Sequence, residues 1–181
     1  MNTKQKGVTL VELMTTLAVG IVLMAVGVPM YQSITANNRI VSQTNGLVTA
    51  LNVAKDDAIR AGGDAGRVVC AKSTALVSQT NCGGADDWAN GWHAFTDDDG
   101  VVGAFDGSDA VIRHWEPLSG DAVITASTGV FRFLSDGSLD AGAEQTLQMG
   151  QTGSVSPARC IRVSVTGVIR THRVEGGLTC P

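Results

Sequence analysis

The sequence predicts an α+β protein in which one long N-terminal helix packs against an antiparallel β-sheet. Up to about residue 61, apolar residues recur every three or four positions, as on one face of a helix. Beyond Gly62 the pattern changes to alternation with a period of two, which is typical of strands. The chain also has 22 glycines but only 4 prolines, which suits tight turns between short strands. Its 181 residues are expected to form one domain.

An uncharged run from Leu13 to Met30 forms the first part of this helix. Its length is close to the roughly 17–25 residues that a membrane-crossing helix needs. Lys4 and Lys6 precede the run, and such a charge pattern keeps the N-terminus in the cytoplasm. A cleaved signal peptide is one alternative, but no Ala-x-Ala-like site follows the run. A simple anchor is another, but Glu12 then needs a partner, because a carboxylate is costly in a membrane.

The residues before this run carry a family resemblance. Lys6–Met14 reads KGVTLVELM and resembles the class III signal of type IV pilins and pseudopilins. The resemblance implies that prepilin peptidase cuts between Gly7 and Val8, removes the leader 1–7 and methylates the amine of Val8. It further implies that Glu12, the fifth mature residue, pairs with the amine of an adjacent subunit during assembly. Val8 departs from the family pattern, which usually has Phe there.

The same resemblance implies a place in the cell. Within a helix over 8–61, the transmembrane half would be 8–30 and would cross the bacterial inner membrane with its N-terminus in the cytoplasm. The periplasmic globular domain would be 62–181. Implied partners are inner-membrane lipid, the inner-membrane assembly platform, and other pilins or pseudopilins that contact the N-terminal helix. Pro29 is expected to kink the helix, because proline removes a backbone donor and clashes with the preceding turn.

The second half of the helix is predicted to be amphipathic, and Gly62-Gly63 to end it. The positions expected to face a sheet are Ile40, Thr44, Leu47, Leu51, Ala54 and Ala58. In the β-rich part, Ile161, Val163 and Val165 alternate with polar residues, as in a half-buried strand. Strands are expected at Arg67–Ala71, Gly91–Thr96, Ala110–Glu116, Ala122–Ala126, Val130–Leu134, Thr146–Gly150, Cys160–Thr166 and Val168–Val174.

A narrower resemblance lies in the β-rich part. Trp88–Asp97 reads WANGWHAFTD and resembles the W-x-x-G-W-x-x-F-x-D pattern of the GspH/FimT group of minor pilins and pseudopilins. Residues 131–137 and 159–167 fit the same group, which implies a type IV pilin-like fold for nearly the whole chain. The aromatic residues expected to pack in the core are Trp88, Trp92, Phe95, Phe131 and Phe133.

Four cysteines lie in the part that is predicted to be exported, and an even count there favours disulfides. Four cysteines allow three pairings. We favour Cys70–Cys82 and Cys160–Cys180, because each closes a short loop. A zinc site is the rival interpretation, but no C-x-x-C motif or nearby pair of histidines accompanies the cysteines.

The acidic stretch Asp97–Asp99, with Asp106 and Asp109, suggests a calcium loop. The EF-hand spacing fails, because Val102 and Ser108 occupy the positions of the glycine and the last glutamate. We therefore expect a solvated loop, no metal and no cofactor.

No enzyme is predicted from the motifs. The sequence contains no G-x-S-x-G, H-E-x-x-H, P-loop or G-x-G-x-x-G motif. His93, His114 and His172 are scattered singly and are expected to be strand residues.

The C-terminal region is basic, although the whole chain has a net charge of −4, which excludes a globally basic nucleic-acid binder. In the FimT branch, a G-R-x-R motif in this region is associated with DNA capture. Here residues 167–173 read GVIRTHR, so Arg170 matches the second arginine and Val168 replaces the first. His172 and Arg173 are the further candidates for DNA binding. Residues three apart on a strand face opposite sides, however, which separates Arg170 from Arg173.

The favoured interpretation is a structural subunit of the GspH/FimT type, a minor pilin-like protein packed near the tip of a type IV pilus or a related filament. The alternatives are a minor pseudopilin H of the type II secretion system and a DNA-binding minor pilin for DNA uptake.

Overall fold

A computed structural model describes residues 7–63, 65–73, 82–101, 105, 109–151, 158–174 and 180. Most of the expected leader, residues 1–6, lies outside them, as does Asp106 of the acidic loop. The chain forms two compact units, Met1–Ala36 and Asn37–Pro181, called here the N-terminal unit and the globular unit. Each is described by itself.

One helix, α1 (Leu10–Ala61), supplies the N-terminal unit and the first element of the globular unit. It begins two residues later than expected, because Thr9 acts as its N-cap: Thr9 Oγ1 accepts a hydrogen bond from the Glu12 amide at 3.3 Å. The helix runs through Pro29 without interruption, and the kink expected there stays a prediction. It ends as expected at Gly62, which adopts a φ of 64° and donates its amide to Ala58.

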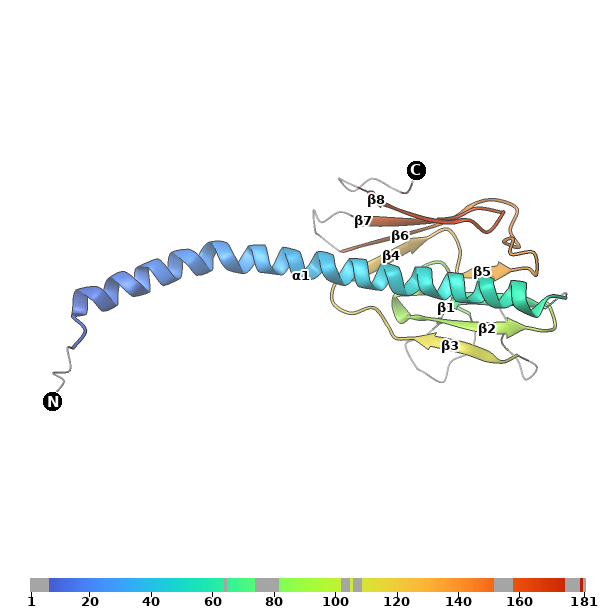
Figure 1. The fold of residues 1–181 in the computed structure, drawn as a ribbon, viewed down its shortest axis with the longest axis horizontal. Coiled ribbons are helices and arrows are strands. Elements are labelled where there is room, and N and C mark those ends of the chain that lie inside the picture. The colour runs from blue at the N-terminus through green and yellow to red at the C-terminus, as the bar shows by residue number, and fades with distance from the viewer. Residues whose placement is uncertain are drawn as a thin grey trace. The chain divides into compact units, whose positions relative to one another are not determined.

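The globular unit contains two four-stranded sheets in which all hydrogen-bonded neighbours are antiparallel (Figure 1). The first sheet has the order β3-β2-β1-β5 and consists of β1 (Gly66–Ala71), β2 (Trp92–Asp97), β3 (Val111–Trp115) and β5 (Val130–Phe133). The second has the order β4-β6-β7-β8 and consists of β4 (Ala122–Ala126), β6 (Gln145–Gln151), β7 (Ala158–Val163) and β8 (Ile169–Val174). A 3₁₀ turn, η1 (Asp87–Asn90), precedes β2. Each expected strand is present, with its ends within about three residues of the expectation, and the α+β class is confirmed.

The second half of α1 fills the main core together with both sheets. Ile40, Thr44, Leu47, Leu51, Ala54 and Ala58 are buried as expected, and Ala50 is buried with them. They belong to one apolar cluster with Val69 and Phe131 of the first sheet and Leu147 and Ile161 of the second. The apolar stripe of α1 therefore gives both sheets a common surface to pack against.

The aromatic residues of the W-x-x-G-W-x-x-F-x-D stretch are all buried, but they divide between two places. Trp88 lies in the main core, edge-on to Phe131 with ring centroids 5.7 Å apart, and its Nε1 donates to the Thr128 carbonyl at 2.8 Å. Phe95 packs with Val68 and Cys70 in a separate small cluster. Strands β1 and β2 of the first sheet are therefore buried on both faces.

Val165 does not continue the buried face of β7, contrary to the sequence expectation. The strand ends at Val163, and Val165 is 43% exposed. Ser164 and Gly167 form a tight turn instead: the Gly167 amide donates to the Ser164 carbonyl at 2.8 Å, with a φ of 70° at Gly167. Period-two alternation alone does not reveal where a strand gives way to a turn.

Candidate functional site

The N-terminal unit presents an apolar helix surface that nothing in the unit covers. Leu10 is 77% exposed, Leu23 is 68% exposed, and the apolar side chains around them are similarly bare. By length and composition, α1 is long and apolar enough to cross a membrane. Since apolar surface of this extent is unfavourable in water, it requires lipid or other helices around it.

Gly7 and Val8 lie just outside the start of this helix. Both are exposed and non-helical, and Val8 is 70% exposed. Glu12 lies in the first turn, exposed, where the positive end of the helix dipole favours a carboxylate. Thr9 and Glu12 also have the spacing of a capping box, a signal for the helix start that the sequence analysis did not use.

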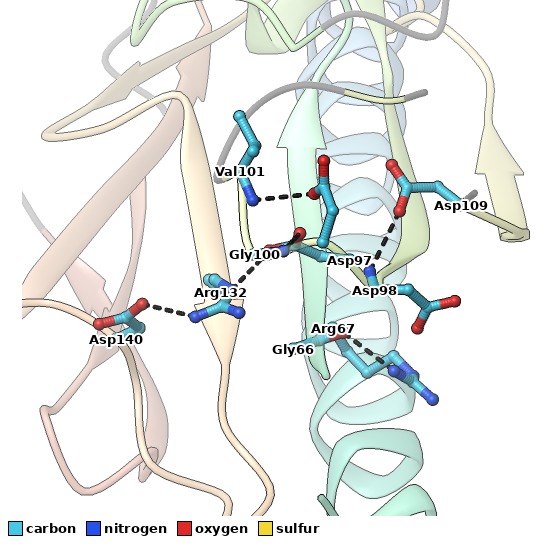
Figure 2. Close-up of polar contacts among 10 residues, drawn as sticks. Gly66, Arg67, Asp97, Asp98, Gly100, Val101, Asp109, Arg132 and Asp140 are labelled. Carbon is cyan, nitrogen blue, oxygen red and sulfur yellow. Dashed lines mark hydrogen bonds and ion pairs between the residues drawn. The ribbon is translucent and has the colours of Figure 1, made fainter. Parts of the chain in front are cut away.

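In the globular unit, the most developed polar cluster surrounds Asp97 at the end of β2 (Figure 2). Asp97 is fully buried, and its Oδ2 accepts a hydrogen bond from Arg132 Nε at 2.5 Å. Its Oδ1 accepts the amide of Gly100 at 2.9 Å. Arg132, on β5, also donates from Nη1 to Asp140 Oδ2 at 2.8 Å. The arginine is thus held between two carboxylates.

The pairing of Arg132 with Asp97 needs the space that Gly66 leaves free. Strand β1 lies between β2 and β5, and Gly66 of β1 is directly opposite Asp97. A Cβ at position 66 would collide with Nε of Arg132 (Figure 2). Burial lowers the pKa of Arg132, but its hydrogen bonds to Asp140 and Asp97 outweigh this and raise the pKa above its ordinary value. Arg132 therefore remains charged and paired.

The expectation of a solvated acidic loop is wrong for Asp97, because the Arg132 pair and the Gly100 amide take it into the protein. The neighbouring carboxylates also accept hydrogen bonds from backbone amides of the loop after β2. Asp99 Oδ1 accepts the amide of Val101 at 2.9 Å, and Asp109 Oδ1 accepts the amide of Asp98 at 3.2 Å. Oxygens of Asp97, Asp99 and Asp109 lie within 4.8 Å of one another. In the described residues, these carboxylates hold the connection between β2 and β3 through hydrogen bonds, and we therefore interpret the cluster as structural.

The four cysteines form two disulfides, Cys70–Cys82 and Cys160–Cys180, the pairing that the sequence analysis favours. Cys70 lies in the small cluster with Phe95, and His93 Nε2 is 3.4 Å from its sulfur. Cys160 packs with Ala158 and Val174 outside the main core. Each bond therefore secures a segment against a sheet.

The structure brings together only part of the predicted basic group. Arg170 and His172 line one hollow on the second sheet, together with Arg162, which lies directly opposite Arg170 in the β7–β8 register. Arg162 Nε donates to Glu144 Oε1 at 2.7 Å, so its charge is partly balanced. Arg173 is opposite Arg159 and does not line this hollow. The sequence analysis missed Arg162, which strand pairing alone brings beside Arg170.

Comparisons with known proteins agree with this architecture. A family model described as the type II transport protein GspH matches residues 43–167, and a model of the prokaryotic N-terminal methylation motif matches residues 2–28. The comparison with curated proteins finds no match. The crystal structure of the type IV minor pilin FimU of Pseudomonas aeruginosa in space group P21 is 18% identical, with a TM-score of 0.56 over 77% of this chain and 92% of that chain. FimU in space group P65 is 16% identical, with a TM-score of 0.48 over 76% and 90%. The likeness to the first structure shows a shared fold.

Proposed function

The chain belongs to the family of the type II transport protein GspH and is a type IV pilin-like filament subunit, and we propose that it acts as a minor pilin near the tip of a type IV pilus or related filament. The single observation that carries the proposal is the contrast between the two parts of α1. Its second half is buried against two sheets, whereas its first half is apolar and bare. A bare apolar helix on a folded globular unit is suited to packing among the N-terminal helices of other pilins in a filament core.

The start of the chain supports processing before assembly. In the proposal, prepilin peptidase cuts between Gly7 and Val8, removes residues 1–7 and methylates Val8. The exposed, non-helical geometry of both residues supports this, because a protease needs an extended segment at the bond that it cuts. The matched methylation motif spans the same residues. The helix would remain on the mature chain, with residues 8–30 in the inner membrane and 62–181 in the periplasm.

Glu12 is proposed as the assembly residue. A carboxylate surrounded by apolar helix requires a partner when lipid or protein covers the helix. The methylated amine of Val8 on an adjacent subunit would supply the positive charge. The platform of the inner membrane and the other pilins are the proposed partners in this step.

The experiment compares chains that carry Glu12→Ala or Glu12→Gln with the parent in cells of the source bacterium. Membranes and sheared filaments are separated, and the chain is measured in each fraction. We expect both variants to be processed and to reach the membrane, but to fall at least tenfold in the filament fraction. Thr15→Ala, one turn away and exposed, is the matched control. Normal incorporation of Glu12→Ala would contradict the assembly role.

A minor pseudopilin of the type II secretion system shares the same helix and leader. The two filaments are distinguished by cross-linking the chain in cells and identifying its neighbours. Pilus subunits beside it support the main proposal, whereas secretion pseudopilins support the alternative.

A DNA-binding minor pilin is the second candidate function, and one observation favours it. Arg170, His172 and Arg162 line one hollow together with Glu144, which pairs with Arg162, so Arg170 is the cation there that we propose could hold a phosphate group. Binding of fluorescent double-stranded DNA at rising salt tests it. Arg170→Ala should weaken binding and reduce its salt dependence, while Arg173→Ala, outside the hollow, is the matched control. Equal binding by Arg170→Ala and the parent would remove this candidate.

A further inference from the structure

His93 lies against the Cys70–Cys82 disulfide. Cys70 and His93 are directly opposite each other in the β1–β2 register, and His93 Nε2 is 3.4 Å from Cys70 Sγ. Both residues are fully buried. Two paired strands therefore hold the sulfur and the imidazole in contact.

The side chains that pack with this sulfur in the small cluster are apolar, and buried Lys72 lies opposite Cys82 in a β-bridge. Val68 and Phe95 pack with Cys70, and Cys82 and Phe105 lie at the edge of the same cluster. A thiolate in such a place is costly unless a cation or a proton donor is next to it. An imidazole beside a thiol can take its proton and stabilise the thiolate that remains. His93 is in position to do this for Cys70.

The two sulfurs differ in accessibility. Cys70 is 0% exposed, whereas Cys82 is partly exposed. Cys82 is therefore the cysteine of this pair that we expect an external thiolate to attack, with Cys70 Sγ as the leaving group. We propose that His93 donates and accepts the proton of Cys70 when this disulfide exchanges with external dithiols and disulfides.

The step balances without any further reagent. In reduction, the thiolate of an external dithiol bonds to Cys82 Sγ as the bond to Cys70 breaks. The electron pair stays on Cys70 Sγ, which takes a proton from the His93 imidazolium. The second thiol of the reagent then gives its proton to water, and its thiolate displaces Cys82 as a thiolate, so the dithiol is oxidised to its disulfide. In oxidation by an external disulfide, the Cys82 thiolate attacks that disulfide and releases one of its sulfurs as a thiolate. Neutral His93 then takes the proton of Cys70, whose thiolate attacks Cys82 Sγ and releases the second external sulfur as a thiolate.

Among the described residues, the titratable groups around His93 and this disulfide come from β1, from the residues after it and from β3, and they include Lys72, which is buried opposite Cys82. Cys70 lies on β1, Cys82 follows β1, and the sulfurs of both lie within 4.8 Å of a His93 nitrogen and of each other. On β3, exposed His114 is opposite His93 with ring centroids 6.0 Å apart. The ring of Phe95 is 5.4 Å away. His114 is therefore the histidine whose effect on the exchange must be separated from that of His93.

The test follows both disulfides in one molecule. The full chain in detergent micelles with EDTA is reduced by excess dithiothreitol, alkylated at intervals and mapped by peptide mass spectrometry. Cys160–Cys180 is the internal reference for the effect of His93→Gln: Cys160 is fully buried and lies opposite His172 in the β7–β8 register, and Cys180 is partly exposed. Each rate is divided by the dithiothreitol thiolate concentration.

We expect the normalised rate at Cys70–Cys82 to rise as the pH falls from roughly 7.5 to 5.5, because imidazolium then protonates the leaving thiolate. His93→Gln should slow this disulfide about tenfold or more, remove its pH dependence and leave Cys160–Cys180 unchanged. His114→Gln, the matched control, should keep the parent's rate and profile.

A flat normalised rate for the parent overturns the proposal, as does equal slowing of both disulfides by His93→Gln. Loss of the pH dependence in His114→Gln overturns it too, because the titration would then belong to His114. If His93→Gln loses the circular dichroism of the folded chain, the profiles of the parent and His114→Gln decide the question.

Discussion

Lys55 Nζ donates a hydrogen bond of 2.8 Å to the main-chain carbonyl of Gly167 and thereby joins helix α1 to the turn between β7 and β8. Gly167 is tightly confined there, because a Cβ on it would collide with the carbonyl oxygen of Gly137. The contact connects residues 112 positions apart.

We expect Lys55→Met to lower the free energy of unfolding of the globular unit by about 1.5–3 kcal/mol, the range for a hydrogen bond to a charged group. Methionine keeps most of the aliphatic length and removes the donor. Urea titration of the full chain in detergent, followed by circular dichroism, measures the change. Asp56→Asn, on an exposed position next to it, should stay within about 0.5 kcal/mol. A Lys55→Met chain as stable as Asp56→Asn would show that the contact does not stabilise the fold.

Gly66→Ala should destabilise the globular unit by up to about 3–5 kcal/mol, because displacing Arg132 leaves the buried charge of Asp97 without its partner. The same urea titration measures it. Gly142→Ala is the control, since a Cβ there meets nothing within 4 Å. Equal midpoints for the two variants would contradict the steric role of Gly66.

Leu51→Ala should cost the globular unit about 2–5 kcal/mol, because Leu51 is fully buried between α1 and the sheets. Leu23→Ala removes the same atoms from a side chain that is 68% exposed and should leave this stability unchanged. Comparison of their thermal midpoints in detergent checks both. Similar losses would mean that the two halves of α1 are not energetically distinct.

Stability should also depend on Asp136 in acid. Hydrogen bonds from the Ser138 hydroxyl and amide hold the pKa of Asp136 below its ordinary value of 3.8. A depressed pKa in the folded state stabilises it above pH 3.8 and loses this effect as the pH falls through the folded-state pKa. Asp136→Asn should therefore be less stable than the parent at pH 7, and the difference should shrink below pH 3.8. Urea titrations at both pH values test this, and a constant difference would argue against the linkage.

Much of the predicted fold came from residue spacing within single helices and strands. The three-to-four spacing from Ile40 to Ala58 places the buried stripe of α1 correctly, because a helix exposes its period directly in the sequence. Glycine at position 62 marks its end for an equally local reason. The end of β7 at Val163 was missed, because hydrogen bonds from another segment take over at Val165: its carbonyl accepts the amide of Leu139.

The sequence by itself determined the α+β class, the apolar N-terminal helix, the family resemblance and the residues at which processing is expected. Each depends on spacing along the chain. Only the tertiary structure decided that Asp97 is buried beside Arg132, that Arg162 lies opposite Arg170, and that His93 touches Cys70. Each pair joins two different strands, and its contact follows from sheet order and register, which no local period encodes.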